Sequence, residues 1–266
     1  MAETPNTPAV RFQLADGVAT VTLDRPQQRN ALSPEIRSGL MDAIQRIKHD
    51  AAVRAVVLAG SGGAFCAGGD LRNIAAMPPD AAGGRQRMKE AHAWLVDLLT
   101  LDRPVVAAVD GAAFGAGFSL ALAADFVVAS PRARFCMSFM RVGLVPDFGA
   151  LYTLPRVVGV QRAKELMLSA REVSAEEAKQ LGIVLDIVPA ERTVERAQAL
   201  AASFVHASGT AVSLVKHALR AAPQGDLQTM FEMEANAQAL AFGTTAHREA
   251  VARFLNKEPA AFQWPA

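Results

Sequence analysis

The chain has 266 residues, of which 51% are hydrophobic, and its formal net charge is only +1. This composition predicts a globular protein with a substantial core, and without dense Lys/Arg runs it argues against nucleic acid or a membrane as a partner. The N-terminal MAETPNTPAV lacks the basic region and apolar run of a signal peptide, and two cysteines are too few for a disulfide framework. We therefore expect a cytoplasmic protein that acts on small molecules.

The first half of the chain alternates predicted strands and helices. RFQLADGVATVTLD alternates apolar and polar residues around a D-G turn, which predicts a β-hairpin. SPEIRSGLMDAIQRIKHD follows as a helix capped by Ser33, then AVRAVVLAGSG as a buried strand, the glycine loop GGAFCAGGDL, and a helix from about 86 to 101. PVVAAVDG is a further strand, and GAGFSLALAADFVVAS runs from a glycine loop through a helix into another. This order predicts an α/β fold with a mostly parallel, covered sheet.

The second half ends in helices. SAEEAKQLG carries a capping box of Ser174 and Glu177, and IVLDIVP supplies a last strand. After about Glu191 the pattern is helical throughout, so we place a boundary near Pro189. The predicted parts are a core over 1–190 and a helical region over 191–266.

Two glycine-rich loops, Phe65 to Asp70 and Phe114 to Ser119, are the first candidates for chemistry. Turns of this kind can aim backbone N–H groups at an oxyanion that develops during a reaction, although glycines also serve tight turns alone. The second loop does not match GxGxxG, and no GK[ST] sequence occurs. The five histidines and two cysteines show no metal-ligand spacing, so we predict neither a nucleotide site nor a metal site.

FMRVGLVPDFGALY places one acid, Asp147, in a mostly apolar stretch. A buried carboxylate has to be paired, hydrogen-bonded or protonated, because an isolated charge in an apolar medium is costly. Asp147 also precedes a predicted helix, so it could cap that helix. Burial beside Phe139, Leu144 and Phe148 would raise its pKa, and N–H groups of the helix would lower it. Local sequence leaves catalyst and cap open, and the two roles are compatible.

The motifs LDRPQQRNAL, FCAGGDL, PVVAAVDGAAFGAGFSLALAADFVVAS, FMRVGLVPDFGALYTLPRVVG and AKELMLSAREVSAEEAKQLGIV resemble, in order and spacing, the crotonase superfamily. This group is also called the enoyl-CoA hydratase/isomerase family, and the resemblance covers nearly the whole chain. It implies a spiral of repeated ββα units whose C-terminal helices form homotrimers or dimers of trimers. It also implies an acyl-CoA thioester substrate and no cofactor, since coenzyme A is part of that substrate.

The resemblance also implies a set of site residues. The oxyanion donors would be the N–H groups of Ala67 and Ala116. Coenzyme A would contact segments 25–31 and 67–72, and a neighbouring subunit would add residues from the helical region. The candidate binding residues are Arg25, Arg29, Ala31, Ala67, Gly68, Gly69, Asp70, Leu71, Arg72, Phe139, Phe254 and Lys257.

Hydratases of this family use two glutamates, and the matching positions here are Ser119 and Phe139, neither of which exchanges a proton near neutral pH. Asp147 matches the acid of isomerase branches such as 1,2-epoxyphenylacetyl-CoA isomerase and Δ3,Δ2-enoyl-CoA isomerase. One carboxylate suffices to remove a proton from one carbon and return it to another. The expected activity is therefore isomerisation.

Three other interpretations of the function remain open. One is a hydratase or lyase of the same family, and another is an inactive CoA-binding relative. The dehalogenase branch also has an acid at this position, but it has a Trp where Phe139 stands, and a phenyl ring donates no hydrogen bond. An apolar acyl chain or ring is expected from five pocket candidates, which are Met88, Trp94, Phe118, Met137 and Phe139.

Overall fold

Six strands form the larger sheet of the computed structural model, which describes residues 7–76 and 80–265. β1 (Val10–Ala15) pairs antiparallel with β2 (Val18–Leu23) around Asp16 and Gly17, both at positive φ, as a tight hairpin turn requires. Parallel pairing continues through β3 (Ala55–Gly60), β4 (Val105–Val109), β6 (Phe126–Ala129) and β9 (Asp186–Ile187). The predicted α/β class and parallel sheet are confirmed.

A smaller sheet continues directly from the larger one. β5 (Ala112–Phe114) follows β4 after two residues, pairs in parallel with β7 (Arg134–Cys136), and β7 pairs antiparallel with β8 (Glu172–Ser174). Cys66 of the first glycine loop bridges to Ala113 of β5. The smaller sheet therefore holds both glycine loops at one end of the fold.

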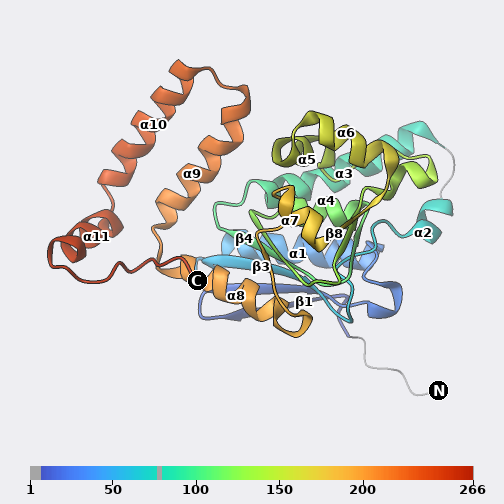
Figure 1. Ribbon diagram of the computed structural model, residues 1–266, viewed down its shortest axis with the longest axis horizontal. Coiled ribbons are helices and arrows are strands. Elements are labelled where there is room, and N and C mark those ends of the chain that lie inside the picture. The colour runs from blue at the N-terminus through green and yellow to red at the C-terminus, as the bar shows by residue number, and fades with distance from the viewer. Residues whose placement is uncertain (1–6, 77–79, 266) are drawn as a thin grey trace.

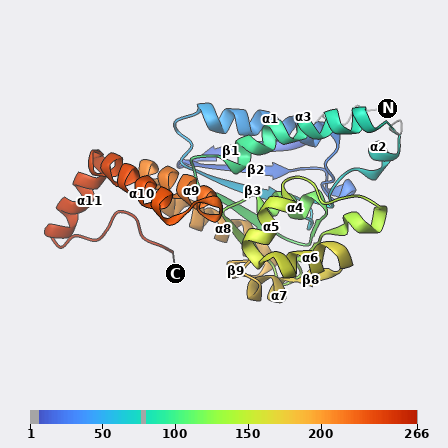
Figure 2. The same cartoon turned by 90° about the horizontal axis from the view of Figure 1, so that it is seen from above.

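Helices cover both faces of the larger sheet (Figure 2). α1 (Pro34–His49) begins where the Ser33 hydroxyl accepts the Ile36 N–H, and it buries apolar residues at the predicted helical spacing. α3 (Ala81–Leu99) packs beside α1 and begins about five residues before the predicted start, because Asp80 caps it by accepting the N–H groups of Ala82 and Gly83. α8 (Thr193–Ser203) lies against the opposite face.

The remaining elements of the core are short. They are α2 (Leu71–Ala75), α4 (Ala116–Leu122), α5 (Ala150–Val158), α6 (Val160–Ser169), α7 (Ala175–Gln180) and the 3-10 helices η1 (Pro26–Gln28), η2 (Ser138–Val142), η3 (Ala190–Arg192) and η4 (Phe204–His206).

The helical arm begins later than the sequence suggests. α8 buries Ala197, Leu200 and Ala201 against β3, β4 and β6, so it belongs to the packed core although it lies beyond residue 190. The arm consists of α9 (Gly209–Ala221), η5 (Ala222–Gln224), α10 (Leu227–Phe242) and α11 (Thr245–Leu255), and it projects from the core (Figure 1). None of the described residues in these helices is buried.

Contacts from α9 and from the C-terminal segment tie the arm to the core, and they include hydrogen bonds that join Arg220 of α9 to the Leu99 carbonyl and to the Tyr152 hydroxyl. The Lys216 ammonium of α9 donates to the Asp125 carboxylate at 2.6 Å and to the Arg103 carbonyl at 2.7 Å. After α11 the chain returns, and Trp264 packs edge-on against Phe126 at 5.5 Å between ring centroids. These contacts fix where the arm leaves the core.

Within the described ranges, no single helix is long and apolar enough to cross a membrane, and only the bent pair 190–206 and 209–224 reaches the required length and apolarity together.

One buried side chain joins η1 to the loop after β3. Asn30 is fully buried at φ 55°, a conformation that Asn tolerates better than most residues. Its Oδ1 accepts the Arg25 N–H at 2.8 Å, and its Nδ2 donates to the carbonyls of Ser61 at 2.9 Å and Ala64 at 2.7 Å. No periodic pattern indicates this role, because it depends on contacts with residues 31 and 34 positions further along the chain.

Replacing Asn30→Ala should destabilise the protein by roughly 2–3 kcal/mol, because two buried carbonyls lose their donor and alanine is strained at positive φ. Urea unfolding measures the change. Gln28→Ala is the matched control, since Gln28 is exposed in the same segment, and it should stay within about 0.5 kcal/mol of the parent. Equal effects of both substitutions would contradict the assigned role of Asn30.

Candidate active site

The two glycine loops touch each other backbone to backbone. Cys66 donates its N–H to the Ala112 carbonyl and accepts the Phe114 N–H, both at 2.9 Å. A Cβ added to Gly68 would lie 2.6 Å from the Phe114 carbonyl oxygen, and one added to Gly117 would lie 2.2 Å from the Cys66 carbonyl oxygen. Side chains at these two positions would force the loops apart, so glycine is required there.

Ala116 is the donor that the second loop offers. It is the first residue of α4, whose N-cap Gly115 has φ 52°, and first-turn N–H groups lack an acceptor within their own helix. Its nitrogen lies 3.5 Å from where a Cβ of Gly68 would stand. The Ala116 N–H therefore lies next to the first loop, as the predicted role requires.

The first loop differs from the prediction. The Ala67 N–H donates to the Arg29 carbonyl at 2.9 Å, so the prediction that it is an oxyanion donor is wrong. The Gly68 backbone lowers the pKa of the Cys66 thiol against the larger effect of burial, so its N–H faces that sulfur. Gly69 is half-buried, and across 7–76 and 80–265 no acceptor is recorded for its N–H. Gly69, two residues beyond Ala67, becomes the candidate donor.

Asp147 does not cap the helix that follows it. α5 begins at Ala150 with Gly149 as its N-cap and without a side-chain cap bond. The Asp147 Oδ1 is buried and has no hydrogen-bond partner in the described part of the chain. The helix-cap interpretation is therefore wrong, and this carboxylate oxygen is left available for another group.

Burial controls the protonation of Asp147. Desolvation raises its pKa to about 6 from 3.8, and the charge of Arg87 and a backbone hydrogen bond oppose that rise less strongly. Phe139 and Phe148 are buried as predicted, whereas Leu144 is 42% exposed and adds little to the apolar surroundings. The two opposing effects that the sequence left unranked are thus ranked in favour of desolvation.

Neither position that carries a glutamate in hydratases offers a proton-transfer group. The Ser119 hydroxyl is fully buried and donates to the Gly115 carbonyl at 3.3 Å. The Phe139 ring lies about 3.9 Å from the place of a Cβ on Gly115, so its edge lies against the second loop. α5, which follows Asp147, packs on α4, so the acid-bearing segment lies beside the Ala116 loop.

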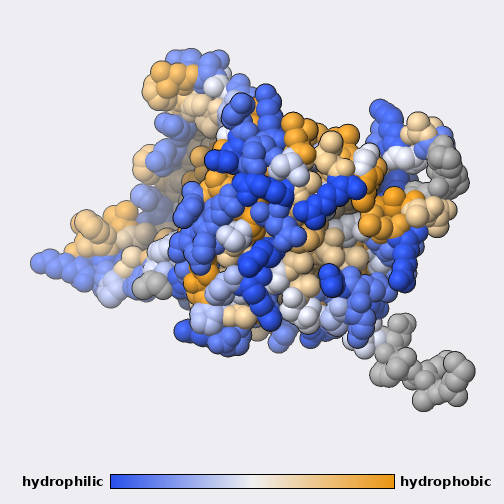
Figure 3. All heavy atoms as spheres, turned by 45° about the vertical axis from the view of Figure 1, so that its right-hand side comes forward, coloured by the Kyte–Doolittle hydropathy of each residue, from blue (hydrophilic) through white to orange (hydrophobic). Residues whose placement is uncertain are grey.

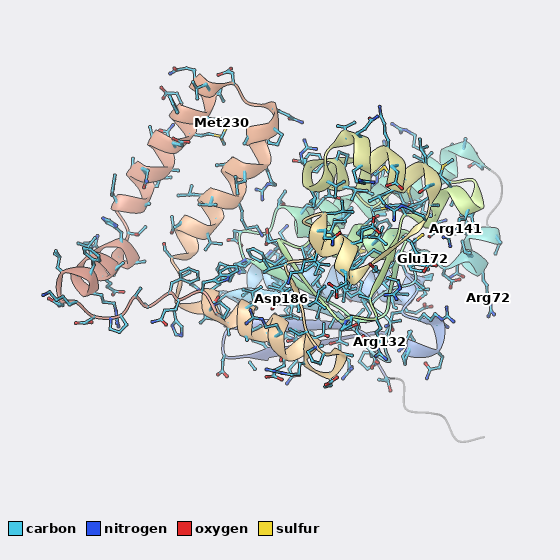
Figure 4. All side chains as sticks on the ribbon, viewed as in Figure 1. Arg72, Arg132, Arg141, Glu172, Asp186 and Met230 are labelled. Carbon is cyan, nitrogen blue, oxygen red and sulfur yellow. The ribbon has the colours of Figure 1, made fainter. Side chains whose placement is uncertain are left out.

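The predicted coenzyme A segments lie side by side. The Leu32 N–H donates to the Gly68 carbonyl at 2.8 Å, which joins the end of segment 25–31 to segment 67–72. Asp70 caps α2 by accepting the Arg72 and Asn73 N–H groups, and Leu71 is exposed. Arg72 lies on α2, at the side of the molecule opposite the arm (Figure 4).

The two candidates in the arm are not brought to this site by their own chain. Phe254 lies in α11 and is 81% exposed, and Lys257 follows that helix. α11 and α2 lie at opposite ends of the molecule in both ribbon views (Figures 1 and 2). These residues could reach such a site only in another copy.

Most of the apolar pocket candidates pack inside the core. Trp94, Phe118, Met137 and Phe139 are buried, while Met88 is partly buried against the same cluster. In the described part of the chain, no group of three or more His, Cys, Asp or Glu side chains could hold a metal ion.

These features define an α/β protein in which two interlocked loops present backbone amides near one half-buried acid. The family described as Enoyl-CoA hydratase/isomerase matches residues 13–265, so the chain belongs to that family.

Two curated relatives and one solved structure illustrate the similarity. A Rhodobacter capsulatus protein called "Probable enoyl-CoA hydratase" is 38% identical and covers 95% of this chain and 97% of its own. The 1,2-epoxyphenylacetyl-CoA isomerase of Escherichia coli K12 is 36% identical and covers 92% and 95%. A crystal structure of an enoyl-CoA hydratase/isomerase from Cupriavidus metallidurans CH34 superposes with a TM-score of 0.93 at 44% identity, covering 99% of each chain.

Asp147→Asn should stabilise the folded protein above pH 6. The folded state binds the Asp147 proton more tightly than the unfolded chain does, because the pKa is about 6 rather than 3.8. Stability of the parent therefore falls as pH rises between these two values, and the ionised form costs roughly 2 kcal/mol after allowance for partial exposure.

Thermal unfolding from pH 4 to 8 measures this effect. The variant should exceed the parent at pH 8 and lose that advantage toward pH 4. Asp97 of α3 supplies the control, because its carboxylate forms an ion pair with Lys48 at 2.6 Å and Asp97→Asn should therefore give no stabilisation at pH 8. A constant difference across the whole range would show that the carboxylate is not desolvated.

Proposed function

We propose that the protein is an acyl-CoA isomerase in which Asp147 alone moves the proton. The observation that carries the proposal is one desolvated carboxylate with an available oxygen, beside two loops whose N–H groups at Ala116 and Gly69 have no acceptor among the described residues. This set supplies a base and an anion-stabilising site without a second acid.

The carboxylate would take a proton from an acyl carbon conjugated to the thioester, and the electron pair would delocalise onto the thioester oxygen. The Ala116 and Gly69 N–H groups would hold that oxyanion, and loss of one such donor typically costs about 2.7–4 kcal/mol. Asp147 would then return the proton to another carbon, which moves the double bond. A pKa of about 6 suits both steps, since the group is ionised at neutral pH and still a competent acid once protonated. The cycle needs no cofactor beyond the coenzyme A of the substrate.

Hydration is the alternative that the similarity to named hydratases keeps open. Adding water needs one group to deprotonate the water and another to protonate carbon. Ser119 and Phe139 supply neither, and the Ser119 hydroxyl is already bonded to Gly115. An inactive CoA-binding protein is the remaining alternative, and the high pKa of Asp147 speaks against it.

Asp147→Asn should lower the rate of double-bond migration by about 10²–10⁴-fold, because the amide cannot accept the proton. Chromatography measures this rate as the conversion of each enoyl-CoA in a panel to a product of the same mass. Asp97→Asn should retain the parental rate. Crotonyl-CoA should keep its conjugated absorbance with the parent enzyme. Loss of that absorbance, or full turnover by Asp147→Asn, would overturn the assignment.

We also propose that the arm mediates a trimer or a dimer of trimers. Large apolar side chains on α9, α10 and α11 are exposed, which are Val215, Leu219, Leu227, Phe231, Leu240, Phe242, Val251, Phe254 and Leu255. Figure 3 displays apolar surface on this arm. A groove of about 890 Å³ lies between arm and core and includes Phe126, Phe204 and Leu219. Burying each large side chain against another copy would contribute about 1.5–3 kcal/mol, and the same contact would bring Phe254 and Lys257 toward a neighbour.

The double variant Phe231→Glu, Leu240→Glu should dissociate the assembly while far-UV circular dichroism stays unchanged, because two charges on α10 oppose apolar burial. Sedimentation equilibrium measures the mass. Gln228→Glu, which adds one charge to the same helix at an exposed site, should leave the oligomer intact. A monomeric parent would contradict the proposal.

A further inference from the structure

The backbone turn after Asp147 decides where its carboxylate lies. The Ala150 N–H donates to the Asp147 carbonyl at 3.1 Å, and Gly149 is the N-cap of α5 at φ 78°. The Asp147 Oδ1 has no hydrogen-bond partner among the described residues, so no such bond fixes that oxygen. The position of the acid therefore depends on this turn, and contacts made by Gly149 bear directly on it.

The C-terminal end of α3 makes the first of these contacts. A Cβ on Gly149 would lie 3.5 Å from the Leu99 side chain and 3.6 Å from that of Leu95, so both side chains lie against this glycine. The Trp94 ring of the same helix meets the Phe148 ring edge-on at 5.6 Å between centroids. The last turns of α3 thus pack against both residues that follow the acid.

Tyr152 of α5 makes the second contact. Its backbone N–H donates to the Gly149 carbonyl at 2.8 Å. The Arg156 guanidinium lies 3.5 Å from the centroid of the Tyr152 ring and donates to the Tyr152 carbonyl at 2.8 Å, so the ring is held against its own helix. Through one backbone hydrogen bond, Tyr152 is therefore joined to the residue two positions after the acid.

One residue of the arm bonds to both of these contacts. The half-buried Arg220, in the last turn of α9, donates from its guanidinium to the Leu99 carbonyl at 3.4 Å, and its own carbonyl accepts the Tyr152 hydroxyl at 3.3 Å. Lys216, one turn earlier, is bound to Asp125 instead, at the start of β6. The two bonds of Arg220 are long and partly exposed to water, so losing one should loosen the turn without unfolding the core.

We propose that Arg220 is a positioning residue for the proton transfer, because through Leu99 and Tyr152 it holds the Gly149 turn, and with it Asp147, in place. This inference rests on the proposed isomerase activity. A misplacement of about 1 Å far from the chemistry can slow a reaction about 10²-fold, so a loosened turn is enough to impair proton transfer. Docking of α9 on the core thereby becomes a condition for full activity, and the arm serves the site of its own chain.

The first measurement needs no turnover. Fluorotryptophan labelling marks Trp94 and Trp264, the two tryptophans of the chain, and fluorine NMR gives one resonance for each, assigned by the loss of one signal in Trp264→Phe. Arg220→Met should shift or broaden the Trp94 resonance, because the contact of Trp94 with Phe148 loosens. Arg220→Lys should restore the parental signal, since an ammonium can also donate to the Leu99 carbonyl.

The matched control is Arg248→Met, because the hydrogen bonds of Arg248 stay within the arm. It should leave the Trp94 resonance unchanged. A Trp94 resonance that stays at its parental position and width in Arg220→Met would overturn the proposal.

The second measurement separates positioning from binding. With the enoyl-CoA that the parent converts fastest, kcat of Arg220→Met should fall roughly 10-fold while KM stays unchanged, because segments 25–31 and 67–72, which would hold coenzyme A, belong to other loops. Arg220→Lys should recover most of the lost kcat, and Arg248→Met should keep the parental rate. Tyr152→Phe, which removes one hydroxyl and leaves the arm intact, should lower kcat in the same direction.

The possible outcomes distinguish this inference from the proposed function. Parental kcat in Arg220→Met, or a loss that Arg220→Lys does not recover, would overturn the positioning role while the isomerase function stands. If sedimentation shows that Arg220→Met changes the assembly, Tyr152→Phe decides, and a parental kcat in that variant overturns the role. If the parent turns over no acyl-CoA while the Trp94 resonance still responds, the link from Arg220 to the acid's turn stands and the proposed isomerase function falls.

Discussion

The structure depends on a backbone contact between the two glycine loops. The loops approach so closely that Gly68 and Gly117 have room for a hydrogen atom but not for a side chain. Gly68 meets the Phe114 carbonyl and Gly117 meets the Cys66 carbonyl, while the peptide groups of Cys66 bond to both ends of β5. Because these are backbone contacts, the direction of each remaining N–H is fixed by the fold and not by side-chain rotamers. The amides of Gly69 and Ala116 can therefore be held ready for an anion without reorganisation when charge develops.

Asp147 is constrained by desolvation and not by backbone contacts of the kind that join the loops. Burial of Asp147 destabilises its charged form. The packing of Trp94 of α3 against the neighbouring Phe148 holds the segment in this buried position. A buried carboxylate oxygen without a hydrogen-bond partner among the described residues is a local loss of stability, of the kind often found where function requires it. The charge of Arg87 on the same helix limits that loss without neutralising the acid.

The arm differs from the core in the exposure of its apolar side chains. α8 buries small residues against the sheet, whereas the described residues of α9, α10 and α11 are left exposed, although they include many large apolar side chains. Lys216 and the aromatic contacts of Trp264 hold the arm at one angle to the core. An arm so placed needs a second surface to be covered, and another copy of the chain supplies one under the proposed assembly.

Periodicity and turn chemistry in the sequence determined the strands of the larger sheet, the major helices and the Ser33 and Ser174 caps, because those signals are local. They did not predict the Asp80 cap of α3 or the three short strands of the smaller sheet. The sequence also identified Asp147 as the single candidate acid, since Ser119 and Phe139 are visible as residue types. Tertiary structure alone decided that the Ala67 N–H is taken by Arg29, that Asp147 caps no helix, and that α8 belongs to the core. The hydrogen bonds of the buried Asn30 were equally hidden. Each of these outcomes depends on which group from a distant part of the chain lies opposite a side chain or amide. No pattern along the sequence encodes such a contact.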